Sequence, residues 1–283
     1  MKNYLISLIL LGSPTACSFS QPSTPDNSPQ TIITWNIRNN NPGDGVNSWP
    51  NRKEKVFSFL RKENPHLLCM QEVLDNQMKD IAKALPQYSW FGVGRDNGKE
   101  AGEYVPIFYL KEKYRMLKGD HFWLSEDPAH AGKPAWDAAC TRMVTWISLI
   151  NKKTTDTLFV FNTHFDHIGV TARLMSAKML SQAADSLAGN HAVVITGDFN
   201  STPSDTPYQV ITSAGFKDAR TVSASAPTGP EYTFTGFDVK GKPGNRIDFI
   251  FVRNTKTVQN YIVRDDSSNG FYLSDHLPVL VGW

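Results

Sequence analysis

Residues 193–200 read Val-Val-Ile-Thr-Gly-Asp-Phe-Asn, an apolar run that reaches a glycine and is followed by an acid and an amide two residues apart. The β-branched run predicts a buried strand, and the Gly-Asp-Phe-Asn part predicts the loop that leaves it. Loops at strand ends are where α/β proteins place their functional sites. Asp and Asn are also ordinary turn residues, so this stretch indicates a site only if other parts of the chain supply partners.

Strand patterns of this kind recur along the whole chain. Residues 117–139 instead predict a long irregular loop that is rich in aromatic residues, including His121, Trp123 and Trp136, and that either contacts substrate or packs on the domain. Because strands dominate and helices separate some of them, we expect an α/β sandwich of two sheets. The predicted strands are 31–37, 66–70, 88–93, 104–110, 142–150, 158–162, 191–196, 246–252, 261–264 and 279–281, and the predicted helices are 53–62, 76–85, 170–188 and 206–214.

The overall charge of the chain is close to zero. Its 283 residues carry 29 Lys and Arg against 27 Asp and Glu, a formal net charge of +2, and no block of like charges stands out. Tight nonspecific binding of polyanions is therefore not predicted, although a local basic groove stays open. The length suits one large domain or two small ones.

The N-terminus resembles a secretory signal peptide over residues 1–16, with Lys2 before an apolar run that is too short to span a bilayer. Cys17 follows a stretch that resembles a bacterial lipoprotein cleavage box, so lipidation of Cys17 and simple cleavage are both open. Residues 17–30 are rich in Ser and Pro and predict a tether. The domain of residues 31–283 is therefore expected to be exported, either to the cell envelope, anchored in the membrane through Cys17, or as a secreted protein.

Two cysteines lie outside the leader, Cys69 in an apolar run and Cys140 before Thr141. A disulfide between them is compatible with an oxidising compartment, but the sequence does not show one. The preferred interpretation is that Cys69 is a small core residue.

Polar residues recur at the predicted strand ends. One further acid, Asp248, lies inside the apolar stretch Ile-Asp-Phe-Ile-Phe, where burial is costly unless the carboxylate is bonded or paired. Each residue alone has an ordinary structural explanation, but the same placement along the whole chain indicates one shared site. The residues at strand ends are Asn36, Glu72, His164, Asp198, Asn200, Asp275 and His276.

Six motifs that contain these residues resemble, in order and spacing, the endonuclease/exonuclease/phosphatase superfamily, which includes DNase I-like nucleases, neutral sphingomyelinases, deadenylases and inositol polyphosphate phosphatases. The resemblance covers residues 31–283 and implies a four-layer α/β sandwich of two packed, mostly antiparallel sheets flanked by helices. The motifs are Trp-Asn at 35–36, Gln-Glu at 71–72, Asn-Thr-His at 162–164, Gly-Asp-Phe-Asn at 197–200, Arg-Ile-Asp-Phe-Ile at 246–250 and Ser-Asp-His-Leu-Pro at 274–278.

The resemblance also implies a divalent metal, usually Mg²⁺, with Mn²⁺ as a substitute. Glu72 resembles its main ligand, Asn36 lies beside it, and Asp275 is a further ligand or a water-mediated contact. Hard oxygen ligands of this kind suit Mg²⁺.

The remaining roles follow the same resemblance. Asp198 resembles the residue that orients or deprotonates the attacking water, and Asn200 the residue that helps to hold the phosphate. His276 is expected to bond a phosphate oxygen, with Asp248 fixing its ring. A placed carboxylate, a metal and cationic donors are what phosphoester hydrolysis requires.

Three further residues complete the implied site. His164 resembles the second histidine of the site, Glu103 its carboxylate partner, and Arg142 an arginine aimed at the phosphate. The chain is thus expected to be a monomeric metal-dependent hydrolase. Its substrate is a phosphodiester, in a nucleic acid or a phospholipid headgroup, or a phosphomonoester of a small phosphorylated molecule.

Two alternatives belong to other classes. Residues 164–167, His-Phe-Asp-His, resemble half of the signature of dizinc metallo-β-lactamase-like hydrolases, but position 162 is Asn where the first histidine is required. The second alternative is a non-catalytic surface binding module that has kept the fold. The presence of every expected site residue argues against it.

Overall fold

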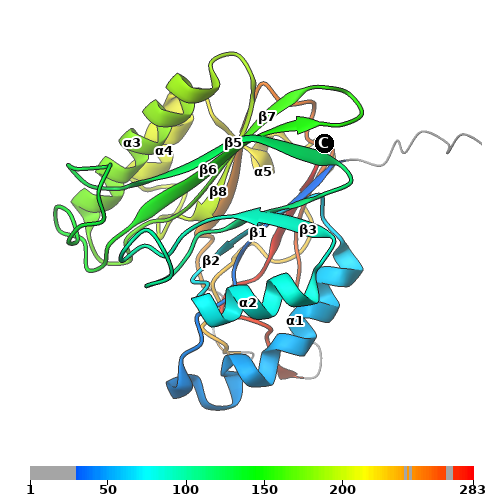
Figure 1. Ribbon diagram of the computed structural model, residues 1–283, viewed down its shortest axis with the longest axis vertical. Helices are drawn as coiled ribbons and strands as arrows, with labels where there is room; N and C mark the ends of the chain where they lie inside the picture. The colour runs from blue at the N-terminus through cyan, green and yellow to red at the C-terminus, as the bar shows by residue number, and fades with distance from the viewer. Residues whose placement is uncertain (1–29, 239–240, 242–243, 266–269) are drawn as a thin grey trace, which may run out of the picture.

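The computed structural model describes residues 30–238, 241, 244–265 and 270–283. Within them the chain forms two six-stranded β-sheets with helices on their outer faces, the DNase I-like α/β sandwich (Figure 1). The predicted signal peptide and the predicted tether lie outside the described residues, except for Gln30. Its backbone N–H donates to the carbonyl of Trp283 at 3.0 Å.

Each sheet collects strands from both halves of the chain. The first contains β1 (Thr31–Asn36), β2 (Leu67–Gln71), β3 (Tyr88–Phe91), β4 (Ile107–Leu110), β11 (Asn260–Val263) and β12 (Val279–Gly282), in the order β11-β12-β1-β2-β4-β3. The second contains β5 (Tyr114–Trp123), β6 (Met143–Asn151), β7 (Thr157–His164), β8 (Ala192–Asp198), β9 (Lys217–Asp218) and β10 (Asp248–Arg253), in the order β5-β6-β7-β8-β10-β9.

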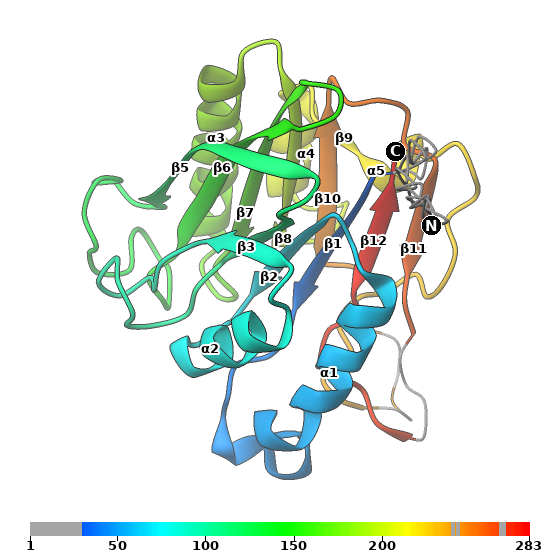
Figure 2. The ribbon, with the colours of Figure 1, turned by 45° about the vertical axis from the view of Figure 1, so that its right-hand side comes forward.

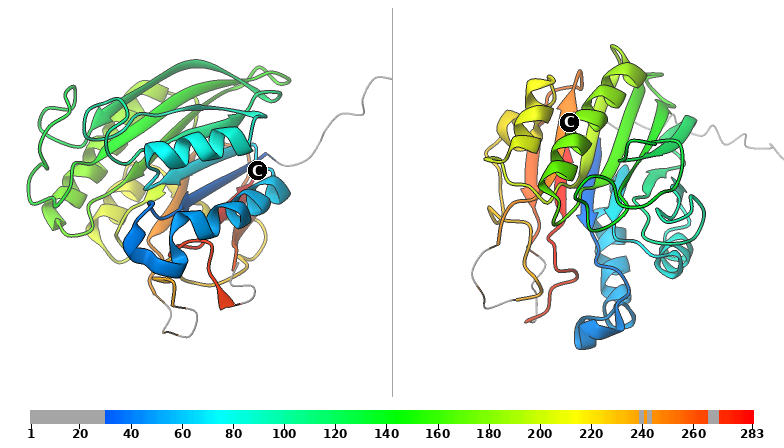
Figure 3. Two further views of the ribbon diagram at one scale, coloured as in Figure 1. Left: turned by 60° about the horizontal axis from the view of Figure 1, so that its bottom comes forward. Right: turned by 90° about the vertical axis from the view of Figure 1, so that its left-hand side faces the viewer.

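The helices cover the two outer faces. α1 (Trp49–Glu63) and α2 (Asp75–Ala84) pack on the first sheet, and α3 (Val170–Ala188) and α4 (Thr206–Ser213) on the second (Figures 2 and 3). Two short helices lie in connections: the 3-10 helix η1 (Pro42–Asn47) and α5 (Ala219–Val222).

Alternating side chains along a strand contribute to different hydrophobic cores. In β1 the side chain of Ile32 joins the core between the two sheets, whereas Ile33 and Trp35 join the core under α1 and α2. This follows from the two-residue period of a strand, which sends successive side chains to opposite faces. Each such side chain, fully buried, stabilises the fold by roughly 1.5–3 kcal/mol.

Strand direction brings the polar strand ends to one edge of the sandwich. β1 pairs in parallel with β2, and β7 with β8, whereas the other pairs are antiparallel. Parallel neighbours end at the same edge, and an antiparallel neighbour begins there. Asp198 at the end of β8 thus lies opposite both His164, at the end of β7, and Asp248, at the start of β10.

The main difference from the sequence prediction concerns residues 117–139. The first part of this segment belongs to β5, which pairs with β6 through a register shift between Met116 and Lys118. The prediction of an irregular loop there was wrong, because β5 is an edge strand whose exposed positions hold Leu117 as well as the charged Arg115, Lys118 and Asp120, so it lacks a clean apolar alternation. From residue 124 on, the segment is irregular as expected.

The cysteines Cys69 and Cys140 are free, and Cys69 is fully buried in the core between the sheets. This agrees with the prediction of Cys69 as a small core residue. Among the helices that the structure describes, none combines the length and the apolar character needed to cross a bilayer.

Candidate active site

The converging strand ends surround a cleft of about 510 Å³. Eight of the ten predicted site residues line it, and the other two, Asn36 and Asp248, are fully buried behind it and bonded to lining residues. The other lining residues were not predicted as part of the phosphoesterase site; they are Arg38, Asn39, Arg95, Cys140, His167, Phe234, Asn245 and Ile247.

Asp198 stands at the centre of the cleft. Its Oδ2 accepts a hydrogen bond from Asn36 Nδ2 at 3.0 Å and lies 3.4 Å from His164 Nε2 and 3.6 Å from His276 Nε2. Its Oδ1 accepts from the backbone N–H of Asn200 at 3.0 Å. Burial raises the pKa of Asp198 to about 7, against the opposing effect of His276. A carboxyl group with such a pKa can act as a base near neutral pH.

His276 is held as a cation. Its Nδ1 lies 2.8 Å from Asp248 Oδ2, and its backbone carbonyl accepts from the indole N–H of Trp35 at 2.9 Å. Burial alone would lower the pKa of His276, but the carboxylates of Asp248 and Asp198 outweigh it and raise the pKa well above its usual value. His276 therefore presents an imidazolium donor to the cleft at neutral pH.

His164 has the opposite character. Burial, and then the positive charge of Arg142, lower its pKa well below the usual value, so the ring is neutral. Asn200 Nδ2 lies 3.2 Å from Nε2 and donates to the carbonyl of Phe165 at 3.0 Å. Since an amide nitrogen donates, Nε2 is the acceptor and the ring proton is assigned to Nδ1, which lies 3.9 Å from Glu103 Oε2. The predicted pairing of His164 with Glu103 is thus present as a long contact.

The predicted metal ligands also meet at the cleft. Glu72 accepts from Asn36 Nδ2 at 3.0 Å and from the backbone N–H of Asn39 at 3.1 Å. Asp275 has a pKa raised by burial and then by the charge of Glu72, with His276 opposing. Buried carboxylates that repel each other form an oxygen donor set that a divalent cation would stabilise. The residues present therefore fit a hard cation. The amide oxygen of Asn36 instead accepts from the N–H of Arg38, so its part as a ligand stays a prediction.

A guanidinium group already contacts this pair of carboxylates. Arg38 Nη1 lies 3.8 Å from Glu72 Oε2, and Arg38 Nε lies 3.9 Å from Asp275 Oδ2. Two bonds of 2.9 Å to Asp44 fix the guanidinium in place. Sequence position offered a signal for Arg38, because it follows Asn36 by two residues.

The Arg142 guanidinium is placed to donate hydrogen bonds to an anion. Its side chain is almost fully buried, Nε lies 3.4 Å from Asp166 Oδ2, and Nη2 lies 3.1 Å from His167 Nδ1. Its Nη1 is buried without a hydrogen-bond partner among the described residues. A buried donor without a partner is costly, and a phosphate oxygen in the cleft would satisfy it.

Asp166 fixes the segment that carries Arg142. Its carboxylate accepts from the backbone N–H groups of residues 139, 140, 168 and 169. Burial would raise its pKa, but these donors outweigh it and hold the pKa well below its usual range. Cys140, Asp166 and His167 lie close enough to share a metal, as do Asp198, Asp248 and His276. In the first group the Asp166 oxygens are already occupied by donors, so the cluster is explained by anchoring of the loop.

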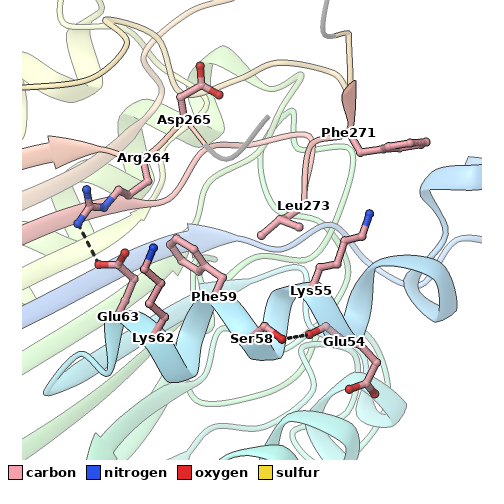
Figure 4. A pocket seen from close by; sticks show the side chains of 10 residues that line it. All are labelled: Glu54, Lys55, Ser58, Phe59, Lys62, Glu63, Arg264, Asp265, Phe271 and Leu273. Carbon is pink, nitrogen blue, oxygen red and sulfur yellow. Dashed lines mark hydrogen bonds and ion pairs between the residues drawn. The ribbon is translucent and has the colours of Figure 1, made fainter. Parts of the chain in front are cut away.

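A second cleft, of about 610 Å³, lies between α1 and the residues Arg264, Asp265, Phe271 and Leu273 (Figure 4). Two contacts join residues of this cleft: Arg264 lies 3.1 Å from Glu63, and the Ser58 hydroxyl donates to the backbone carbonyl of Glu54 at 2.9 Å. No histidine is found among the described residues that line it, so the smaller cleft is the better candidate for the active site.

The chain belongs to the endonuclease/exonuclease/phosphatase family, whose model matches residues 33–276. This confirms the resemblance drawn from the six motifs. The geometry also counts against the dizinc alternative. His164 contacts Asp198, whereas His167 contacts Arg142, so the two histidines have different partners.

Solved structures agree. An endonuclease/exonuclease/phosphatase from Bacteroides vulgatus is 39% identical over 90% of this chain and 98% of its own, with a TM-score of 0.86. A mannosyl-6-phosphatase from Bacteroides thetaiotaomicron is 32% identical over 89% and 98%, with a TM-score of 0.83. Among curated relatives are two uncharacterized proteins of Acanthamoeba polyphaga mimivirus. The chain spans 29% of the first, at 22% identity over 59% of this chain, and 92% of the second, at 25% identity over 83% of this chain.

Proposed function

We propose that this chain is a metal-dependent phosphoesterase that hydrolyses small phosphomonoesters, with phosphorylated sugars as the substrate class. One observation carries the proposal: Asp198, with a pKa near neutrality, lies between a cationic His276 and a neutral His164. A base and a cationic donor with separated pKa values, beside an oxygen donor set for a cation, are the parts that hydrolysis of a phosphoester needs.

The residues divide the work as follows. Asp198 orients the attacking water and accepts its proton, and His276 donates to a phosphate oxygen, held in its tautomer by Asp248. Arg142 Nη1 donates to a second oxygen of the phosphate. Glu72 and Asp275 would hold the cation, Mg²⁺ or Mn²⁺. When bound, the cation neutralises negative charge on the phosphate.

The burial of an aromatic candidate for base stacking favours a small substrate over nucleic acid. Trp123, a candidate for base stacking, is 5% exposed and donates its indole N–H to the carbonyl of Arg95 at 2.7 Å, so it packs on the domain. Nonspecific binding of single strands needs several exposed aromatic residues along a basic groove. A small substrate is further supported by the 32% identity to the Bacteroides thetaiotaomicron mannosyl-6-phosphatase.

A substrate panel tests the proposal. The purified domain is incubated with a hexose 6-phosphate, bis(p-nitrophenyl) phosphate, duplex DNA and sphingomyelin, each with Mg²⁺, with Mn²⁺ and with EDTA. We expect phosphate release from the hexose phosphate that requires the metal and has the highest kcat/KM of the panel. Activity that persists in EDTA, or activity confined to the diesters, contradicts the proposal.

We also propose that the domain works outside the cytoplasm as a monomer, exported by residues 1–16 and either lipidated at Cys17 or released. Mass spectrometry of the N-terminal peptide separates lipidation from simple cleavage. If the full chain is found in the cytosol with residues 1–16 retained, export is ruled out. Light scattering of the domain after size exclusion checks the monomer.

A further inference from the structure

We propose that Phe234 is the platform against which the ring of the substrate's leaving group packs, and that this ring is a six-membered sugar. The inference rests on the proposed function and names the part of the cleft that selects the substrate.

Phe234 is an exposed aromatic ring in an otherwise polar cleft. It is 39% exposed, and among the described residues that line the cleft it is the single phenyl, phenol or indole side chain. Leaving part of a large apolar ring in water forgoes the free energy of its burial. An occupant of the cleft that covered the ring would recover that free energy.

The ring sits on a backbone that is tightly fixed. The N–H groups of Thr233 and Phe234 both donate to the carbonyl of Asn245, at 3.0 and 3.1 Å, and the N–H of Leu277 donates to the carbonyl of Thr233 at 2.7 Å. A Cβ at Gly244 would lie 2.2 Å from the carbonyl oxygen of Phe234, so the returning chain passes where only glycine fits. The exposure of the ring is therefore built into the fold.

The ring also lies beside the chemistry. The Phe234 and His276 rings pack in a T-shaped arrangement, with a centroid distance of 5.1 Å and an interplanar angle of 67°. His276 is the donor to the phosphate, so a group esterified to that phosphate lies within reach of the exposed part of Phe234. The ring is thus placed to contact the leaving group as well as the histidine.

The chemistry of the cleft favours a sugar over a base. A hexopyranose offers one face of C–H groups and a rim of hydroxyls. These match a cleft whose described lining combines one such aromatic ring with hydrogen-bonding side chains such as Asn39, Asn245 and Arg95. A nucleobase is usually held by stacking between aromatic or apolar side chains on both of its faces. The cleft supplies one such ring.

The test compares two monoester substrates of the same charge, a hexose 6-phosphate and glycerol phosphate, in wild type, Phe234→Ala and Phe234→Tyr. We expect Phe234→Ala to raise KM for the hexose phosphate about tenfold, equivalent to about 1.4 kcal/mol, with kcat nearly unchanged. KM for glycerol phosphate should stay within about twofold of wild type, and Phe234→Tyr should behave like wild type. Phe271→Ala is the matched control, because this phenyl is 45% exposed but lines the second cleft (Figure 4), and it should change neither KM.

Equal rises of KM for both substrates, or a change confined to the pH profile of kcat, would mean that Phe234 acts only by supporting His276 and would overturn the inference. If wild type hydrolyses the monoesters but Phe234→Ala changes KM equally for the hexose phosphate and for glycerol phosphate, this inference fails and the proposed function stands. A wild-type domain that hydrolyses neither monoester, with or without metal, defeats the proposed function and this inference with it.

Discussion

Replacing Arg38 with Gln should make the site bind divalent cations more tightly. The guanidinium lies 3.8 Å from Glu72 Oε2 and 3.9 Å from Asp275 Oδ2, and it acts there as a tethered counter-charge to the predicted metal ligands. The Arg38→Gln change removes that charge and leaves a shorter, polar side chain. It also leaves Asp44, now unpaired, as additional negative charge near the site.

These distances give the size of the effect. Two unit charges about 4 Å apart interact by about 1 kcal/mol in water and about 4 kcal/mol at an effective dielectric constant of about 20. The Arg38 side chain is 27% exposed, so solvent screening places each contact toward the lower value. A net change of about 1–2 kcal/mol corresponds to roughly tenfold in the dissociation constant of the cation.

Isothermal titration of the metal-free domain with Mn²⁺ measures this directly, and thermal unfolding gives a second readout. We expect the Kd to fall about tenfold. The Tm of the metal-free variant should fall by roughly 2–4 °C per kcal/mol lost, whereas the metal-loaded variant should melt like wild type. Arg38→Lys, which keeps the charge, and Arg115→Gln, at an exposed position of β5, serve as controls. If Arg38→Gln binds Mn²⁺ as weakly as wild type, or more weakly, the counter-charge argument is wrong.

Three further changes probe the scaffold of the site. Gly197→Ala should lower the Tm by several degrees, because a Cβ there would lie 2.4 Å from a carbonyl oxygen of the neighbouring strand, and an unchanged melting curve would refute this close approach. Asp248→Asn removes the largest contribution that raises the pKa of His276. Because the imidazolium is lost as pH rises through its pKa, the alkaline limb of the kcat profile should move to lower pH, and a limb that stays in place contradicts the assigned role. Asp166→Asn weakens the anchoring of Arg142 and should raise KM about tenfold, with a smaller change in kcat. A fall in kcat at constant KM would show that Asp166 does not act by anchoring Arg142.

Much of the fold could be predicted because its strands are strongly patterned. β8, with the run Val-Val-Ile, and β1, with Ile-Ile, are buried on both faces and read as strands without context. β5 could not be predicted in this way, since Lys118, Gly119 and Asp120 interrupt its pattern and only pairing with β6 holds it in a strand.

The candidate site shows the same division. Motif residues such as Glu72 and His276 were found because strand ends place them at one edge of the sandwich. Phe234 and the role of Arg38 were not, because both depend on contacts across the fold; the one sequence signal for Arg38 was its position two residues after Asn36. The Arg38 guanidinium contacts two carboxylates on separate segments. The Phe234 ring contacts a histidine 42 positions later in the sequence. A spacing pattern carries no information on such contacts.

The central claim is that Asp198 is the base of a metal-dependent phosphoesterase. The most direct measurement is the kcat of Asp198→Asn on a hexose 6-phosphate with Mg²⁺, together with its Mn²⁺ affinity by titration and its Tm. We expect kcat to fall by about 10³-fold, while the metal still binds and the Tm falls by no more than a few degrees, because Asn fills the same buried space but keeps one of the two acceptor oxygens. A variant that turns over at the wild-type rate with normal metal binding contradicts the account.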